Sequence, residues 1–304
     1  MKTDTELMNE LAVESQYLRP LSDKDSADLK RLLLEMYKDI ARVCDEYELV
    51  YMVGGGTCLG AVRHHGFIPW DDDLDLIMPR ESYDKLIELL KTGVMGDDYV
   101  YDAPSKTHDC RSLYLKIFRR NTLNVELSCE CTPGPTGVFI DIFPIENAPR
   151  FAITRRMKGI ISDVIAAISV SVLYAQYPSK KYEEFMRLSR KSFQRYSTRL
   201  LVGKIFGIIN HRKWAWWYDL FNKQAKFTGY WTVPTGRAHY YGETHEVEVF
   251  VPTQTGVFEG IMVKLPANTD AYLKALYGDY MRIPPVEKRE RHFVYRFSCG
   301  PYSV

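Results

Sequence analysis

The sequence predicts an α+β fold in which strands near both ends of the chain enclose a helical middle third. Three observations support this. Apolar residues recur at helical spacing early in the chain, charged and apolar residues alternate at strand spacing after residue 73, and no internal repeat interrupts the 304 residues. With 46% hydrophobic residues, the chain can bury a sizeable core.

The first predicted helix is marked by apolar residues that recur at steps of three and four between Leu29 and Tyr47. Ser22 and Asp25 are placed to cap its start. The apolar run 49–53 then has the character of a short strand. The predicted order of elements is therefore helix, strand and glycine turn.

A glycine-rich turn follows this strand and begins a short helix. Backbone N–H groups can approach a phosphate closely at such a turn, and the helix N-terminus adds a favourable dipole. Arg63 and His65 close the helix, which Gly66 can terminate, and they could reach a phosphate or only cap the helix. The candidate phosphate-binding residues of the turn are Gly54, Gly55, Gly56 and Thr57.

An acidic strand is predicted directly after residue 72. The strand period of two places Asp73 and Asp75 on one face, with the intervening leucines on the other. Adjacent carboxylates repel, and a divalent cation between them relieves the repulsion. Hard oxygen ligands suit Mg²⁺, with Mn²⁺ as the alternative. Asp71 shares the parity of the pair and is a further candidate ligand.

The predicted strand 138–143 carries one acidic residue, Asp141, among apolar neighbours. An unpaired charge there would be costly, so we interpret Asp141 as a third metal-binding carboxylate that could also accept a proton from an attacking hydroxyl. Lys116 and Thr122, on and after the predicted strand 113–118, could neutralise a diphosphate or form a solvated edge. Arg289, Arg291 and His292 present the same two alternatives.

The remaining elements suggest three regions. A helix is predicted over Glu81–Lys91, and further strands near 246–251 and 257–265. Residues 1–150 are expected to form the catalytic core with its N-terminal helix, residues 151–230 a helical insertion, and residues 231–304 the strands and helix that complete the domain.

Charge and cysteine content limit the partners. Forty basic and thirty-nine acidic residues give a net charge of +1, so nucleic acid is not an expected partner. The six scattered cysteines and the polar start predict a reduced, cytoplasmic protein. His108, Cys110, Cys129 and Cys131 leave a zinc site open, although their spacing is irregular and ordinary thiols are favoured.

Two segments bear on membrane contact. The apolar stretch 159–174 is shorter than the roughly 20 residues of a bilayer span, so we interpret it as a core helix. Segment 200–221 mixes basic residues with three tryptophans and could lie in a membrane interface or form a packed helix pair. Peripheral association with the inner face of a membrane therefore stays open.

The longest specific pattern reads Gly-Gly-Thr-Cys-Leu-Gly-Ala-Val-Arg-His-His-Gly-Phe-Ile-Pro-Trp-Asp-Asp-Asp-Leu-Asp over residues 55–75. The acidic strand at 138–144, Phe-Glu-Gly at 258–260 and Tyr-Gly-Asp-Tyr-Met at 277–281 add to it. Together these segments resemble the LicD family of phosphotransferases, relatives of the fukutin proteins. Cys58 and His65 stand where the family usually has leucine and lysine.

The resemblance implies a nucleotidyltransferase-like mixed β-sheet flanked by helices. It also implies transfer of a phosphoalcohol from a CDP-alcohol donor to a hydroxyl of a glycan or glycolipid precursor, with CMP released. CDP-choline is the favoured donor, but ethanolamine, glycerol and ribitol stay open as alternatives to choline. Asp73 and Asp75 match the family's metal-binding positions, and Asp141 matches its third acidic position.

Two other functions stay open. A nucleotidyltransferase would use the same metals to transfer a nucleotide and release pyrophosphate. An inactive scaffold would instead hold a glycan-assembly complex at the membrane. The presence of Asp73, Asp75 and Asp141 argues against the scaffold.

Overall fold

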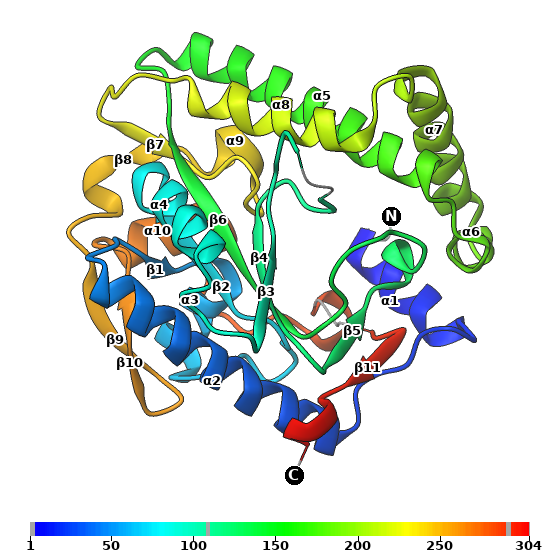
Figure 1. Cartoon of the computed structure of the whole chain (residues 1–304), viewed down its shortest axis with the longest axis horizontal. Helices are drawn as coiled ribbons and strands as arrows, with labels where there is room; N and C mark the ends of the chain where they lie inside the picture. The colour runs from blue at the N-terminus through cyan, green and yellow to red at the C-terminus, as the bar shows by residue number, and fades with distance from the viewer. Residues whose placement is uncertain (1–3, 108–109, 290–292, 304) are drawn as a thin grey trace.

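A computed structural model describes residues 4–107, 110–289 and 293–303, and it confirms the predicted α+β class (Figure 1). The α-helices are α1 (Asp4–Glu14), α2 (Asp23–Glu46), α3 (Gly55–His64), α4 (Arg80–Lys91), α5 (Ala152–Gln176), α6 (Lys180–Arg187), α7 (Arg190–Phe206), α8 (His211–Lys223), α9 (His239–Gly242) and α10 (Thr269–Tyr277). Short 3₁₀ helices are η1 (Leu127–Cys129), η2 (Val247–Val249), η3 (Val286–Lys288) and η4 (Gly300–Tyr302).

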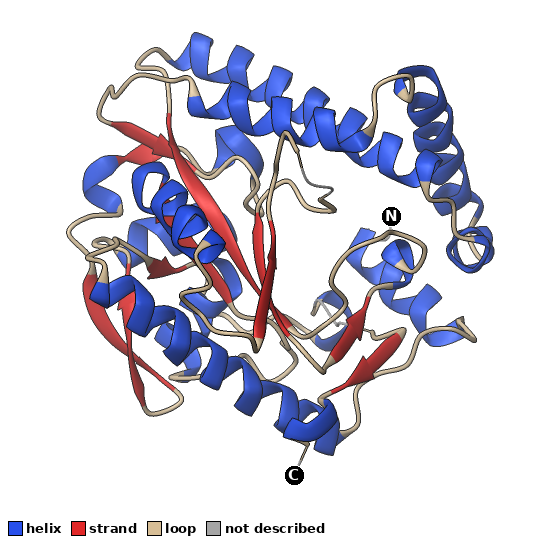
Figure 2. Ribbon diagram, in the orientation of Figure 1, coloured by secondary structure: helices blue, strands red, loops and turns tan. Residues whose placement is uncertain are grey.

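The strands build one mixed sheet and two small ribbons (Figure 2). They are β1 (Met52–Val53), β2 (Asp75–Pro79), β3 (Tyr99–Asp102), β4 (Leu115–Arg119), β5 (Leu123–Val125), β6 (Phe139–Asn147), β7 (Tyr230–Thr232), β8 (His245–Glu246), β9 (Gln254–Phe258), β10 (Ile261–Leu265) and β11 (Arg296–Ser298). The main path runs β1-β2-β6-β4-β3, with β7 and β8 continuing from β6. Only β2 and β6 pair in parallel along this path, which makes the sheet mixed.

The main core lies between the sheet and its helices. As predicted, α2 is amphipathic, and Ser22 caps it by accepting a hydrogen bond from the Asp25 N–H (3.0 Å). Its apolar face packs with the strands of the sheet and with the C-terminal hairpin of β9 and β10. The two ends of the chain therefore share one core, because β10 lies beside β1 and β9 beside α3.

Two local predictions are wrong at their boundaries. Helix α3 ends with His65 in the left-handed conformation (φ 56°) rather than at Gly66. Gly66 lies so close to the Glu259 side chain that a Cβ would overlap it, while Glu259 accepts a hydrogen bond from the Phe67 N–H (3.0 Å). Glycine is needed at 66 for this close approach, and the preceding residue, His65, takes the left-handed conformation that ends the helix.

The strand predicted near 246–251 is also wrong, since pairing stops after Glu246 and the chain enters η2. The turn buries Phe250 completely, between the rings of Trp231 and Tyr272. Burial of one large aromatic ring here outweighs the strand propensity of the valines, which local sequence alone cannot show.

Helices α5 to α8 follow β6 and precede β7 along the chain, and α5 packs against both α7 and α8 (Figure 1). The interpretation of 159–174 as a core helix is wrong. Helix α5 has 25 residues, and only a third of its most apolar window is buried. Among the described residues it is the only helix long and apolar enough to cross a membrane.

Candidate active site

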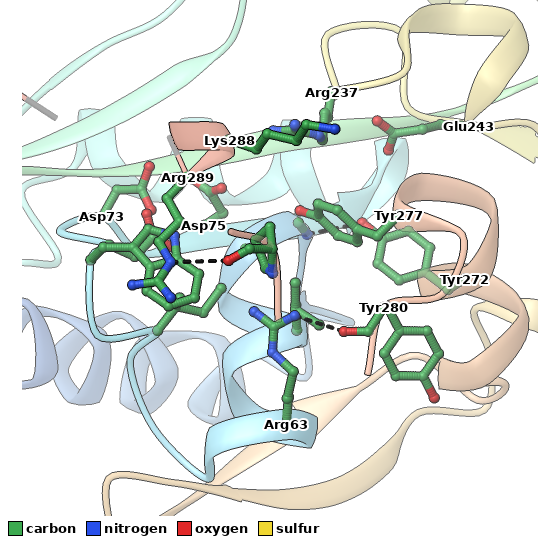
Figure 3. A pocket seen from close by; sticks show the side chains of 18 of the residues that line it. Arg63, Asp73, Asp75, Arg237, Glu243, Tyr272, Tyr277, Tyr280, Lys288 and Arg289 are labelled. Carbon is green, nitrogen blue, oxygen red and sulfur yellow. Dashed lines mark hydrogen bonds between the residues drawn. The ribbon is translucent and has the colours of Figure 1, made fainter. Parts of the chain in front are cut away.

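A cavity of about 680 Å³ opens between α3, β2 and α10 (Figure 3). Gly55 and Gly56 of α3 line it together with Asp71, Asp73 and Asp75. Figure 3 shows the acidic pair on one side and the tyrosines of α10 on the other. The cavity thus joins the glycine turn and the acidic strand predicted from the sequence.

The carboxylates come from two neighbouring strands. Asp75 begins β2 and lies directly opposite Asp141 of β6 in the parallel register. Burial raises the pKa of Asp75 well above its usual range, and the charges of Asp73, Asp141 and Asp71 raise it further. The four acidic candidates therefore interact as one cluster.

The glycines make room for these carboxylates. A Cβ on Gly56 would come within 2.8 Å of Asp71 Oδ2, and one on Gly55 within 3.1 Å of Asp75 Oδ2. The Gly55 N–H donates to the Tyr272 hydroxyl (3.0 Å), so it does not point to an open phosphate site. Close approach of a carboxylate accounts for glycine at 56, and the positive φ of Gly55 (47°) favours glycine at 55 as well.

Backbone bonds fix the turn against β2. Gly54 caps α3, and its N–H donates to the Asp75 carbonyl (3.0 Å). The Asp75 N–H donates in turn to Thr57 Oγ1 (2.8 Å). Thr57 is buried and lies outside the cavity lining. Its hydroxyl positions Asp75 rather than facing a phosphate.

Asp141 forms an ion pair with Lys116 on the neighbouring strand β4. Lys116 Nζ of β4 lies 2.7 Å from Asp141 Oδ1 and donates to Oδ2 (3.0 Å), and each side chain is only 14% exposed. Burial opposes the lysine charge, yet Asp141, with Tyr114 and Glu126 nearby, raises the pKa of Lys116. Burial also raises the pKa of Asp141, which Lys116 counteracts. Neither residue lines the cavity, so this pair lies next to Asp75 in the sheet but outside the cavity wall.

Three further candidates fall in different places. Arg63 lines the cavity and donates to the Tyr280 carbonyl (2.7 Å). His65 is exposed at the end of α3, outside the lining. Thr122 donates to the Arg119 carbonyl (2.7 Å) and accepts from the Val138 N–H (2.8 Å), so its hydroxyl ties β6 to the preceding turn.

Sequence reasoning missed much of the basic and aromatic wall. The lining residues that it overlooked or weighed lightly are Trp70, Glu126, Arg237, Glu243, Tyr272, Tyr277, Arg282, Lys288 and Arg289. Arg289 rests over the Trp70 ring (4.3 Å) and Arg237 over Tyr277 (5.3 Å). Lys288 and Arg289 had a signal in the basic run after the C-terminal block, whereas Arg237 had none. Arg291 and His292 lie outside the described residues.

The residue types suit a hard divalent cation. Burial and then repulsion within the acidic cluster raise the pKa of Asp75, and a cation beside it would relieve that repulsion. Across the described residues, no three His, Cys, Asp or Glu side chains already surround a common point. Magnesium at this cluster therefore stays a prediction. Within the described part of the chain, Cys110, Cys129 and Cys131 form no such cluster either, and His108 lies outside it.

Comparison with known proteins explains the arrangement. Residues 48–155 match the sequence model of the LicD/FKTN/FKRP nucleotidyltransferase domain. These residues form a LicD-family domain. The LicD-family domain runs from β1 to the start of α5 and contains the glycine turn and all four acidic candidates. The basic residues of the C-terminal wall lie outside it.

Similarity also extends beyond that domain. The chain is 24% identical to lipopolysaccharide cholinephosphotransferase LicD of Haemophilus influenzae over 273 residues, which cover 83% of this chain and 89% of that protein. It is 40% identical to the uncharacterized protein RP689 of Rickettsia prowazekii over 58 residues, 19% of this chain and 22% of that protein. The long alignment thus reaches past the LicD-family domain.

Proposed function

We propose that this protein is a LicD-like phosphotransferase that moves a phosphoalcohol, with phosphocholine favoured, from a CDP-alcohol to a hydroxyl of a glycan or glycolipid precursor. One observation carries the proposal: the acidic cluster around Asp75 opens into a cavity that is also lined by Arg63, Arg237, Lys288 and Arg289. The long similarity to a lipopolysaccharide cholinephosphotransferase supports this choice of reaction and acceptor class.

The basic wall suits the donor diphosphate. Arg63, Arg237, Lys288 and Arg289 all line the cavity, and guanidinium groups bind phosphate oxygens through paired hydrogen bonds. Stacking over Trp70 and Tyr277 holds Arg289 and Arg237 in defined orientations. A clamp oriented in this way would place the diphosphate against the acidic cluster without reorganisation during transfer.

Asp73 and Asp75, with Asp71 beside them, would hold Mg²⁺, or Mn²⁺ in its place. A bound ion of this kind neutralises charge on the transferred phosphoryl group and on the leaving CMP. Lys116 forms an ion pair with Asp141 on the strand next to Asp75, and this pair contributes to the electrostatic field at the cluster. Glu126 lines the cavity close to this pair and is the carboxylate best placed to accept the proton of the incoming hydroxyl.

A reduced, cytoplasmic setting is part of the proposal. Four of the six cysteines, Cys44, Cys58, Cys110 and Cys299, are buried. A CDP-alcohol donor made in the cytoplasm would meet a membrane-linked acceptor at the inner face of the membrane.

A panel of CDP-choline, CDP-ethanolamine, CDP-glycerol and CDP-ribitol, scored by CMP release with Mg²⁺ and with EDTA, tests the function. We expect CMP release with at least one donor, loss of release with EDTA, and a fall of at least about a hundredfold in Asp73→Asn. Asp72→Asn is the matched control, because Asp72 lies outside the cavity lining.

Release of pyrophosphate from CTP, without CMP from any CDP-alcohol, would identify a nucleotidyltransferase instead. Failure to bind any of these nucleotides, measured by calorimetry with Mg²⁺ present, would favour an inactive scaffold. Full activity of Asp73→Asn would refute the assignment of the acidic cluster.

A further inference from the structure

The apolar face of α5 is only partly covered. Ile153, Met157, Ile160 and Val164 follow one another at steps of four, three and four, so they form one stripe along the helix. All four are exposed, and Ile153 is 75% exposed. The opposite side of α5 carries buried Ser162 and Ser169, which bond to Asn222 (3.0 Å) and His211 (3.1 Å) of α8.

Helix α7 covers the continuation of the same stripe. Ser171 and Ala175 extend the spacing of Val164, and Gly203 of α7 lies so close to both that a Cβ would overlap them. Beyond this crossing, α7 ends and its last apolar side chains turn outward. Ile205 is exposed, and Ile208 in the following turn is 95% exposed. We call the exposed N-terminal half of the α5 stripe, from Ile153 to Val164, the apolar ledge.

The charge around the apolar ledge is strongly one-sided. Residues 151–230 contain fifteen Lys and Arg but only four Asp and Glu, whereas the rest of the chain contains twenty-five and thirty-five. Arg156, Lys204 and Lys213 are exposed on the helices that form or adjoin the ledge. The net charge of +1 for the whole chain hides this separation, which gives the helical layer a positive field.

We propose that the apolar ledge inserts into the interface of an anionic lipid bilayer, with the surrounding Lys and Arg side chains against the lipid head groups. Exposed aliphatic side chains on one face with a basic surround are the properties of an interfacial helix. Trp217 of α8 is also exposed in this layer, and tryptophan favours the head-group region.

Two other arrangements fit less well. A symmetric pairing of two copies through the ledge would bring two strongly basic layers together, at a cost in charge repulsion. A transmembrane position for α5 would require breaking the buried hydrogen bonds of Ser162 and Ser169 to α8. An orientation of α5 along the bilayer surface keeps those bonds and covers only the exposed stripe.

The test is flotation of the full-length protein with vesicles. We expect binding to vesicles that contain phosphatidylglycerol, weaker binding to pure phosphatidylcholine vesicles, and loss of binding in high salt. Met157→Glu should lower the partition coefficient by at least about tenfold, because it places a charge in the ledge. Met262→Glu is the matched control, since Met262 on β10 is exposed to a similar degree (64% against 59%).

Equal partitioning of the two variants, or no binding of the unmodified protein, would overturn the proposal. Light scattering without lipid adds a second criterion: a dimer that Met157→Glu dissociates would make the ledge a self-association surface instead. Circular dichroism of both variants confirms that each is folded. The result is independent of the proposed function, because vesicle binding needs neither donor nor metal.

Discussion

Two buried carboxylates near the cavity differ in what surrounds them. Asp141 has Lys116 within ion-pair distance, and that charge opposes the effect of burial on its pKa. Glu243 accepts a hydrogen bond from the Ala238 N–H (2.9 Å), and burial raises its pKa to about 7. An ion pair thus opposes the effect of burial at Asp141, whereas Glu243 holds its proton up to near-neutral pH.

This difference predicts a pH dependence of stability. Between about pH 4.5 and pH 7 the folded protein keeps a proton on Glu243 that the unfolded chain has released, so stability falls as the pH rises through this window. The loss amounts to roughly 3 kcal/mol and is complete above the folded pKa. Glu243→Gln keeps the acceptor oxygen without the charge. We therefore expect the variant to lack this loss and to be more stable than the unmodified protein above neutral pH.

Urea unfolding across this pH range measures the effect. Glu248→Gln removes the same charge at an exposed position and should leave the curve unchanged. If Glu243→Gln and the unmodified protein lose stability in parallel as the pH rises, Glu243 is not the group responsible.

At the scale of elements, α3 and β2 form one unit. The Gly54 and Asp75 backbones bond across it, and Thr57 accepts from Asp75, so the first turn of the helix fixes the first residue of the strand. Tyr272 of α10 holds the Gly55 N–H from the other side. The acidic cluster is therefore positioned by hydrogen bonds among three elements, with little freedom to adjust.

Gly56→Ala tests this rigidity. The added methyl would lie 2.8 Å from Asp71 Oδ2, so Asp71 must move, while the helix itself gains from alanine. We expect CMP release to fall by about tenfold or more, with the free energy of unfolding changed by less than about 1 kcal/mol. Gly159→Ala in α5, where the methyl meets only ordinary contacts of 3.4 Å, should preserve both. Unchanged turnover in Gly56→Ala would show that the cluster tolerates displacement of Asp71.

At the scale of the whole molecule, one arginine links the helical layer to the sheet. Arg80 at the start of α4 binds Glu146 of β6 and lies 2.8 Å from Asp219 of α8. Glu146 is only 1% exposed, so it depends on this partner for its charge. A second apolar cluster, which includes Leu11, Phe185 and Tyr196, ties the far end of the helical layer to α1.

Arg80→Met should therefore destabilise the protein by about 3 kcal/mol or more, because it leaves Glu146 buried without a counter-charge. Adding Glu146→Gln should recover much of that loss, since the buried charge is then gone. Lys91→Met is the control: its pair with Glu88 is exposed, and a change within about 0.5 kcal/mol is expected. Thermal unfolding of the three variants and the unmodified protein measures these changes, and a small effect of Arg80→Met alone would contradict the linking role.

The sequence by itself determined the α+β class, helix α2 with its Ser22 cap, and the proximity of the glycine turn to the acidic strand, because each follows from short-range periodicity or from one contiguous pattern. It could not place Arg237 or Glu243, which reach the cavity from distant segments and carry no local signal. Only the tertiary structure paired Asp75 with Asp141 and left half of the α5 stripe uncovered. Strand register and the coverage of one helix by another depend on packing between residues far apart in the chain, and no local pattern encodes them.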